Sequence, residues 1–334
     1  MSIDEQSIRQ ALEDILSRDP DLKAEIDGSE AEEEAATGEA SVTAALATPA
    51  EQPGGFDWYA SRYRRARPVT TVERGRVVAF AGNAEGRTWQ WRLAPGAELL
   101  RKAINAVGRI EVEGNGDGPV AGTGFLIREN VIATNAHVAA QFAEKSGSKF
   151  VFRLNVGGEE MEASIDFLEE AGGDESLEFE ITGIFHFETD NLPDVAFLEV
   201  APRSGRKVLP EPLEFYTGEV KPGQFVVAIG YPERDTREKH ARELEAIFGD
   251  VFGKKRVSPG EIRRVERDAI VHDCSVLRGS SGSPMIDVQT GKVVGIHSKG
   301  EFLEDNFAVP APAASAVLDK VVPSPQVPPI ADAA

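Results

Sequence analysis

The chain of 334 residues contains a single cysteine, Cys274, so it cannot form an internal disulfide. Proteins without disulfides are typical of reducing compartments. Residues 1–5 lack the positive charges that open a secretory signal, and no apolar segment of signal length follows them. Together these absences predict a cytoplasmic protein.

Long hydrophobic runs and positive charge are also scarce. No apolar run approaches the roughly 20 residues that a helix needs to cross a bilayer. Lys and Arg number 36 against 56 Asp and Glu, and residues 1–52 alone hold fourteen acidic and three basic residues, a net charge of −11. Phosphate binding requires clustered Lys and Arg, so we expect no nucleic acid as a partner. The lack of a long apolar run predicts that no membrane is a partner either.

The N-terminal part of the chain divides by composition. Apolar residues at helical spacing, such as Ile8, Leu12 and Ile15, predict an amphipathic helical leader over residues 1–26. This leader is either a docking helix or a marginal, solvated one, since short isolated helices are weak in water. Residues 27–55 have few large apolar side chains and are expected to form an acidic flexible linker.

Residues 56–104 differ in character, because they contain all three tryptophans of the chain and a group of four arginines. Within them, segments 77–80 and 88–93 resemble strands. A helix is expected from Pro95 to Ala106. We interpret residues 56–104 as an accessory or pro-region, with no function assigned.

Short strands dominate residues 105–322, which are followed by a Pro- and Ala-rich tail at 323–334. The predicted strands are residues 107–113, 120–128, 131–134, 150–156, 179–187, 195–200, 225–230, 269–272, 284–287, 293–298 and 307–310. Residues 232–267 interrupt this series and are expected to form an inserted helix and a surface loop. Many short strands with few helices predict an all-β barrel or sandwich pair.

A serine between glycines is the first indication of chemistry. Residues 279–284 read Gly-Ser-Ser-Gly-Ser-Pro, and the glycines let the backbone turn tightly enough to aim N–H groups into one small space. Ser281 is the candidate nucleophile, and the N–H groups of Gly279 and Ser281 are the candidate oxyanion-hole donors. A plain Gly/Ser loop has the same composition. The catalytic interpretation therefore requires a base and a carboxylate elsewhere.

Both appear upstream, each at the end of an apolar strand. His137 follows segment 131–134, and Asp194 precedes segment 195–200. Taken singly, His137 is equally explained as a packed histidine and Asp194 as a strand-capping aspartate. Asp190 is the rival carboxylate, but Asp194 adjoins the apolar strand directly, which suits a desolvated group that orients an imidazole.

The order His137, Asp194, Ser281, together with Gly-Thr-Gly-Phe at 122–125, resembles a chymotrypsin-fold serine protease of the bacterial trypsin-like class. The resemblance covers residues from about 105 to 320. It implies two six-stranded β-barrels with a catalytic cleft between them, in which His137 and Asp194 come from the first barrel and Ser281 from the second. The family implies that the histidine takes the serine proton while the aspartate orients the histidine.

The segment Gly-Ile-His that ends at His297 is similar to the glutamyl endopeptidases, in which a histidine helps to bind an acidic P1 side chain. This resemblance implies a substrate pocket that includes His297, Ser298 and Val276. Ser275 would form its floor, in place of the aspartate that a preference for Lys or Arg requires. Val276 replaces a threonine of that subfamily, and Lys299 stands where an aromatic is usual. An acidic P1, a small or apolar P1 and no sharp preference all stay open.

The predicted function is a serine endopeptidase that acts on a protein or peptide substrate without cofactor or metal. A regulatory partner is expected to dock on the N-terminal region. The alternatives are a catalytically silent adaptor with the protease fold and an esterase-type acyl hydrolase. His186, His240 and His272 lack the spacing of a metal site and are expected to be structural. Cys274 is expected to be structural too, because a nucleophilic role would need its own base.

Overall fold

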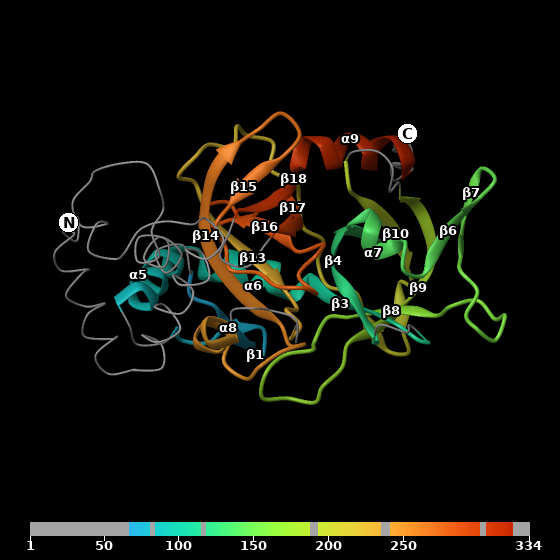
Figure 1. The fold of residues 1–334 in the computed structure, drawn as a ribbon, viewed down its shortest axis with the longest axis horizontal. Coiled ribbons are helices and arrows are strands. Elements are labelled where there is room, and N and C mark those ends of the chain that lie inside the picture. Colours follow the sequence, from blue (N-terminus) through green and yellow to red (C-terminus); the bar gives the residue numbers. More distant parts are fainter. Residues whose placement is uncertain are drawn as a thin grey trace, which may run out of the picture. The chain divides into compact units, whose positions relative to one another are not determined.

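Two closed antiparallel β-barrels make up most of the computed structural model, which describes residues 67–80, 84–114, 118–187, 193–234, 241–300 and 305–322 (Figure 1). The first barrel consists of β3 (Val107–Val112), β4 (Val120–Arg128), β5 (Val131–Thr134), β8 (Ala163–Asp166), β9 (Glu178–Phe187) and β10 (Ala196–Val200). The second consists of β13 (Phe225–Gly230), β14 (Arg256–Val265), β15 (Ile270–His272), β16 (Pro284–Asp287), β17 (Val293–Gly300) and β18 (Asn306–Pro310). The predicted fold of two six-stranded barrels is confirmed. The predicted leader, linker and C-terminal tail lie outside the described residues.

Both barrels have the same strand order. Neighbours around the first are β3-β4-β5-β10-β9-β8, and neighbours around the second are β13-β14-β15-β18-β17-β16, with β13 also paired to β14. Counted from its own first strand, each barrel therefore runs 1-2-3-6-5-4. No repeat is visible in the sequence, so the two halves share a topology without sharing a pattern of residues. Closure pairs the strand edges that an open sheet would leave exposed.

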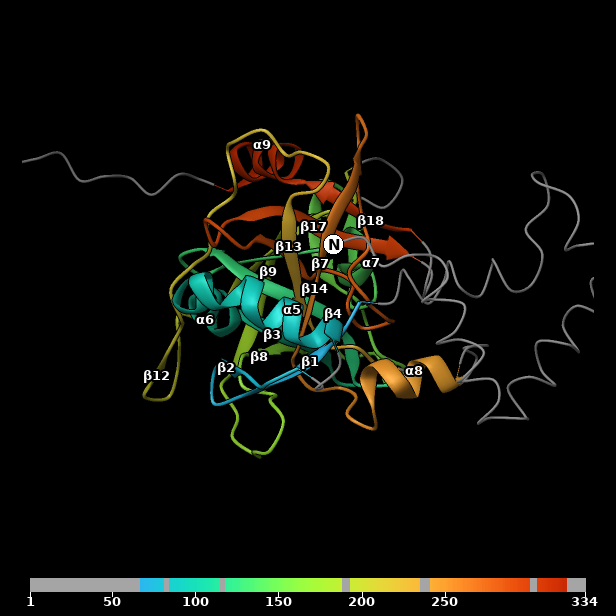
Figure 2. The same cartoon turned by 90° about the vertical axis from the view of Figure 1, so that its left-hand side faces the viewer.

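The described N-terminal segment packs against the second barrel. It contains β1 (Thr70–Glu73), β2 (Arg76–Val77), α5 (Ala84–Leu93), the short 3-10 helix η1 (Ala94–Gly96) and α6 (Ala97–Asn105). β1 pairs with β14 and with β2. Figure 2 views the molecule from the side on which α5 and α6 lie. The ring of Trp89 in α5 is buried edge-on against Phe225, the first residue of β13. The helix expected after Pro95 is confirmed by η1 and α6.

Two strand predictions in this segment are wrong. β2 ends at Val77, so no strand covers 77–80. Residues 88–93 belong to helix α5. Trp89, Trp91 and Leu93 alternate as in a strand, but Trp91 is exposed, while the buried positions 86, 89 and 93 follow the spacing of a helix.

Segment 232–267 also differs from the expectation. The expected helix is present as α8 (Ala241–Phe248), but β14 occupies much of the expected surface loop. Pro259 and Gly260 lie inside β14, and its last residues are exposed, so the sequence pattern of a strand is weak there. Pairing with β13, β15 and β1 overrides that weak local pattern. β8 is the other barrel strand that the sequence did not predict.

The remaining elements lie outside the barrels. They are the hairpin of β6 (Ala143–Ser146) and β7 (Lys149–Phe152), the hairpin of β11 (Arg203–Ser204) and β12 (Lys207–Val208), and the helices α7 (Ala136–Ala139) and α9 (Ala311–Val321). No helix in the described part of the chain is both long and apolar enough to span a bilayer.

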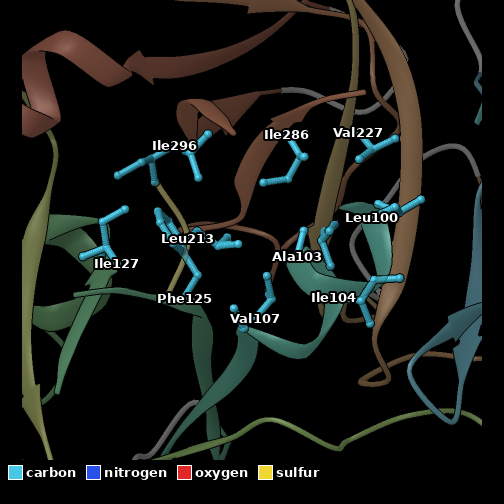
Figure 3. Close-up of a cluster of buried hydrophobic side chains, with 14 of the residues drawn as sticks. Leu100, Ala103, Ile104, Val107, Phe125, Ile127, Leu213, Val227, Ile286 and Ile296 are labelled. Carbon is cyan, nitrogen blue, oxygen red and sulfur yellow. The ribbon is translucent and has the colours of Figure 1, made fainter. Parts of the chain in front are cut away.

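A shared hydrophobic core joins the two barrels (Figure 3). It contains Leu100 and Ile104 of α6, Phe125 of β4, Val227 of β13 and Ile296 of β17, all of them buried. Separate clusters fill the interior of each barrel. Protein interiors pack as densely as organic crystals, so a shared core restricts movement of one barrel against the other. The core therefore sets the relative position of the loops at the seam between the barrels.

Candidate active site

The register of β5 and β10 brings His137 and Asp194 together. Thr134 at the end of β5 pairs with Ala196 at the start of β10, so the residues after one strand lie beside those before the other. His137 is the second residue of α7 (Ala136–Ala139), for which Asn135 is the N-cap. Its ring Nδ1 is 2.8 Å from Oδ2 of Asp194, and its backbone N–H donates to Oδ1 over 3.2 Å. With the proton on Nδ1, the ring keeps Nε2 as a proton acceptor.

Asp194 is held as a carboxylate by its hydrogen bonds. Its Oδ2 also accepts from the hydroxyl of Ser298 over 2.5 Å, and its carbonyl accepts from the side-chain amide of Asn135 over 2.9 Å. Partial burial opposes ionisation, but the hydrogen bonds and charge of His137, with the Ser298 hydroxyl, outweigh it and lower the pKa of Asp194 below its ordinary value. Asp194 is therefore ionised at neutral pH and can orient the imidazole of His137.

Ser281 reaches the same place from the second barrel. It lies in the loop between β15 and β16, and its carbonyl accepts from the N–H of Thr123 in β4 over 2.8 Å. Its Oγ donates to the carbonyl of Ser298 in β17 over 3.3 Å. Ser298 thus contacts both Ser281 and Asp194. One residue of the second barrel therefore links the serine to the histidine–aspartate pair of the first.

Two glycines are required by the shape of this loop. Gly279 has a φ of +86° and Gly282 a φ of +90°, a region that favours glycine. A Cβ at Gly279 would collide with the carbonyl oxygen of Tyr231, and a Cβ at Gly282 would collide with the carbonyl oxygen of Thr123. Both positions therefore exclude a larger residue on two independent grounds.

Two N–H groups beside Ser281 have no backbone acceptor. Beside them, the N–H of Ser280 donates to the carbonyl of Leu277, that of Gly282 to the carbonyl of His297 and that of Ser283 to the carbonyl of Ser280. Among the residues that the structure describes, the N–H groups of Gly279 and Ser281 have no such partner. These are the two groups that the sequence assigns to an oxyanion hole. Unpaired N–H groups beside a serine are the arrangement that stabilises a tetrahedral oxyanion.

A model of the trypsin-like peptidase domain family matches residues 122–296, which is just over half of the chain. The match includes His137, Asp194 and Ser281. The chain belongs to the trypsin-like peptidase family. Two curated relatives of the chain are named as serine proteases.

Serine protease HTRA3 of Mus musculus is 27% identical over 193 residues, which cover 57% of this chain and 35% of that protein. Serine protease Rv3671c of Mycobacterium tuberculosis is 29% identical over 179 residues, which cover 52% of this chain and 35% of that protein. The chain thus spans about a third of the length of these relatives. The crystal structure of Deg5 aligns over 70% of this chain and 96% of its own, at 21% identity and a TM-score of 0.48.

The residues expected in the substrate pocket lie in the second barrel of this chain. Val276 is buried in the hydrophobic cluster inside that barrel. The Ser275 hydroxyl accepts from the N–H of Arg67 over 3.0 Å and donates to the carbonyl of Arg67 over 2.8 Å. Nδ1 of His297 lies 3.2 Å from Nε2 of His272. Ser275 and His297 therefore already have polar partners within the chain.

The two buried histidines are uncharged. Burial lowers the pKa of His272 to about 3. Burial also lowers the pKa of His297 well below its ordinary value, and positive charge on His272 or His137 would lower it further. Each imidazole is therefore neutral across the physiological range. That His297 binds an acidic P1 side chain stays a prediction.

Three contacts at the site are not predicted from the sequence. Thr123 donates its hydroxyl to the carbonyl of Gly279 over 2.8 Å, Asn306 donates from Nδ2 to the carbonyl of Cys274 over 3.1 Å, and Arg67 binds Ser275. The two residues of each contact are far apart in sequence, so local patterns do not reveal their pairing. The Gly-Thr-Gly pattern around Thr123 is the one local feature that singles out a residue of these contacts.

Two other candidates for chemistry are a cysteine nucleophile and a metal site. Cys274 is fully buried, and burial raises the pKa of its thiol well above the ordinary value, so the nucleophilic thiolate is disfavoured. Within the described ranges, no three His, Cys, Asp or Glu side chains gather as a metal ion would require. His240 lies outside the described residues.

Proposed function

We propose that this chain is a serine endopeptidase that hydrolyses peptide bonds through an acyl-enzyme on Ser281. The observation that carries the proposal is that Ser298 joins Ser281 to the His137–Asp194 pair. Beside Ser281, the N–H groups of Gly279 and Ser281 have no backbone acceptor among the described residues. Membership of the trypsin-like peptidase family supports the same conclusion.

The proposed reaction uses each group in turn. Nε2 of His137 accepts the proton of the Ser281 hydroxyl as Oγ attacks the substrate carbonyl, and the N–H groups of Gly279 and Ser281 hold the resulting oxyanion. Asp194 remains ionised and stabilises the imidazolium. His137 then gives its proton to the leaving amine. A water molecule, deprotonated by His137, hydrolyses the acyl-enzyme and regenerates Ser281.

For the P1 side chain, we propose a small or apolar residue. Of the residues that the resemblance assigns to the pocket, Val276 is apolar and buried, and the Ser275 hydroxyl is already bonded to Arg67. His297 is buried and neutral, so it offers no positive charge to a carboxylate. An acidic P1 side chain buried beside it would have to be protonated. Cleavage of a proteome-derived peptide library tests this proposal. Enrichment of Asp or Glu at P1 that disappears in His297→Ala would overturn it.

Labelling with a small fluorophosphonate probe tests the nucleophile. We expect labelling of the full chain on the peptide that contains Ser281, and none in Ser281→Ala. Ser283→Ala is a matched control in the same loop, because the Ser283 hydroxyl is buried without a hydrogen-bond partner among the described residues. It is expected to keep the label.

The same experiment separates the alternatives. No labelling at any pH between about 6 and 9 would support a silent adaptor. Labelling with ester turnover but no peptide cleavage would support an esterase-type hydrolase. A cytoplasmic location and regulation through the N-terminal region stay predictions of the sequence.

A further inference from the structure

The side chain of Arg67 binds the start of the loop that carries Ser281. Its Nε and Nη2 both donate to Oδ2 of Asp273, over 3.0 and 2.6 Å. Asp273 follows β15 directly, and its Oδ1 accepts from the N–H of Glu261 in β14 over 2.7 Å. Hydrogen bonds between ionised partners are about twice as strong as neutral ones. Arg67 therefore ties the N-terminal segment to the first residue of this loop.

The main chain of Arg67 binds the same loop two residues later. Its N–H and its carbonyl both bond to the hydroxyl of Ser275. Pro68 follows Arg67 and disfavours a helical backbone at the residue before it. An extended residue presents its N–H and its carbonyl to the same side, so one hydroxyl can reach both. Pro68 thus favours the extended backbone at Arg67 that allows both main-chain groups to bind the hydroxyl of Ser275.

Helix α5 supports the Arg67 side chain from another side. Nη1 donates to Glu85 over 3.1 Å, and the guanidinium lies 5.8 Å from the centre of the buried Trp89 ring. Arg263 also approaches Oδ2 of Asp273, at 3.7 Å, but its side chain is 52% exposed, against 16% for Arg67. Arg67 is therefore the more firmly held of the two cations at Asp273.

Different partners hold the far end of the loop. The carbonyl of Gly279 accepts from the Thr123 hydroxyl, and the carbonyl of Arg278 accepts from the N–H of Glu233 over 2.7 Å. Arg67 therefore holds the start of residues 273–277, which include two expected pocket residues, while Thr123 and Glu233 hold the end that carries the nucleophile. The N–H of Ser280, which donates to the carbonyl of Leu277, joins the two parts.

We propose that Arg67 is a positioning residue for substrate specificity, which holds residues 273–277 in place as the wall of the P1 pocket. The proposal rests on the proposed function, since a pocket wall matters only in an enzyme. Without the Arg67 side chain, Asp273 loses its closest cation and the main-chain contact with Ser275 loses its anchor. Binding of the P1 side chain should then weaken, while the reactivity of the Ser281 hydroxyl should stay the same.

Arg67→Ala and Arg67→Lys test this in the full chain. For peptides that differ only at P1, we expect Arg67→Ala to raise KM at least tenfold and to flatten the P1 preference. The rate of labelling by the small fluorophosphonate probe should stay within about twofold, and Arg67→Lys should be intermediate. Arg128→Ala is the matched control, because Arg128 also binds a carboxylate, that of Asp319 in α9, and it should behave as the parent.

Hydrogen exchange separates this proposal from the proposed function. In Arg67→Ala, amide exchange should accelerate at residues 273–277 and not at Gly282, whose N–H donates to His297, whether or not the protein is active. Absence of that local acceleration, or an unchanged P1 profile, would overturn the role of Arg67, as would equal losses for peptides and probe. A parent chain that is never labelled would overturn the proposed function instead.

Discussion

The hydroxyl of Ser298 donates to Oδ2 of Asp194 over 2.5 Å, across the seam between the two barrels. Asp194 precedes β10 of the first barrel, and Ser298 lies in β17 of the second. The carbonyl of Ser298 also accepts from Ser281. The geometry of the candidate triad therefore depends on how the barrels dock, and on this residue in particular.

Ser298→Ala should lower kcat about tenfold with little change in KM. The variant removes one hydrogen bond to a partly buried carboxylate, and such bonds contribute about 1.5–3 kcal/mol. Asp194 would then orient His137 less firmly. Steady-state kinetics on one peptide substrate measures the effect. Ser164→Ala is the control, since it removes a similar bond from Ser164 to Glu178 on the surface of the first barrel, and it should leave kcat unchanged. Equal kinetics for the two variants would contradict the prediction.

Gly279→Ala should reduce kcat by about 10²–10³, because the collision with Tyr231 turns an oxyanion donor away from its position. Gly223→Ala is the matched control. Gly223 also has a positive φ, of +81°, but a Cβ there meets no atom within 4 Å. That variant should lose only about 1–2 kcal/mol of stability and keep its activity. Comparable activity losses in both would show that strain, rather than the oxyanion hole, is responsible.

Lys255→Met should destabilise the fold by about 3–5 kcal/mol. Lys255 is fully buried, and its Nζ donates to the carbonyls of Ile104 and Phe167 and lies 3.6 Å from Glu170. Burial lowers its pKa to about 8, so it is charged at neutral pH. Removing it leaves the buried Glu170 without its cation. Urea denaturation measures the loss, and the double variant with Glu170→Gln should recover part of it. A double variant as unstable as the sum of both single ones would contradict this.

Stability should fall as the pH drops from about 6.5 towards 3, in part because of His272. Its pKa is about 3 in the folded protein, below the roughly 6.5 of an unfolded chain. In this window the unfolded state binds a proton that the folded state does not, so unfolding is favoured as the pH falls. His272→Gln should reduce the slope of unfolding free energy against pH by up to about 1.4 kcal/mol per unit. Parallel curves for parent and variant would show that His272 does not contribute.

Local patterns in the sequence predicted those features of the site that depend on residues close together in the chain. The glycines at 279 and 282 are visible because only glycine tolerates that backbone, and His137 and Asp194 are visible because each adjoins a short apolar strand. The same reasoning failed where a local pattern is ambiguous. Trp89, Trp91 and Leu93 fit a strand and a helix alike, and burial of Trp89 against Phe225 decided for the helix.

Taken alone, the sequence predicted an all-β barrel or sandwich pair, because strand periodicity is a property of short segments. Its resemblance to trypsin-like proteases implied the two barrels and the roles of the three residues of the candidate triad. The tertiary structure alone decided that Ser298 reaches Asp194, that Lys255 is buried, and that Arg67 binds Ser275 from 208 positions away. Contacts of this kind form only when the barrels close and share a core, so their strength and geometry come from packing that no short pattern of residues encodes.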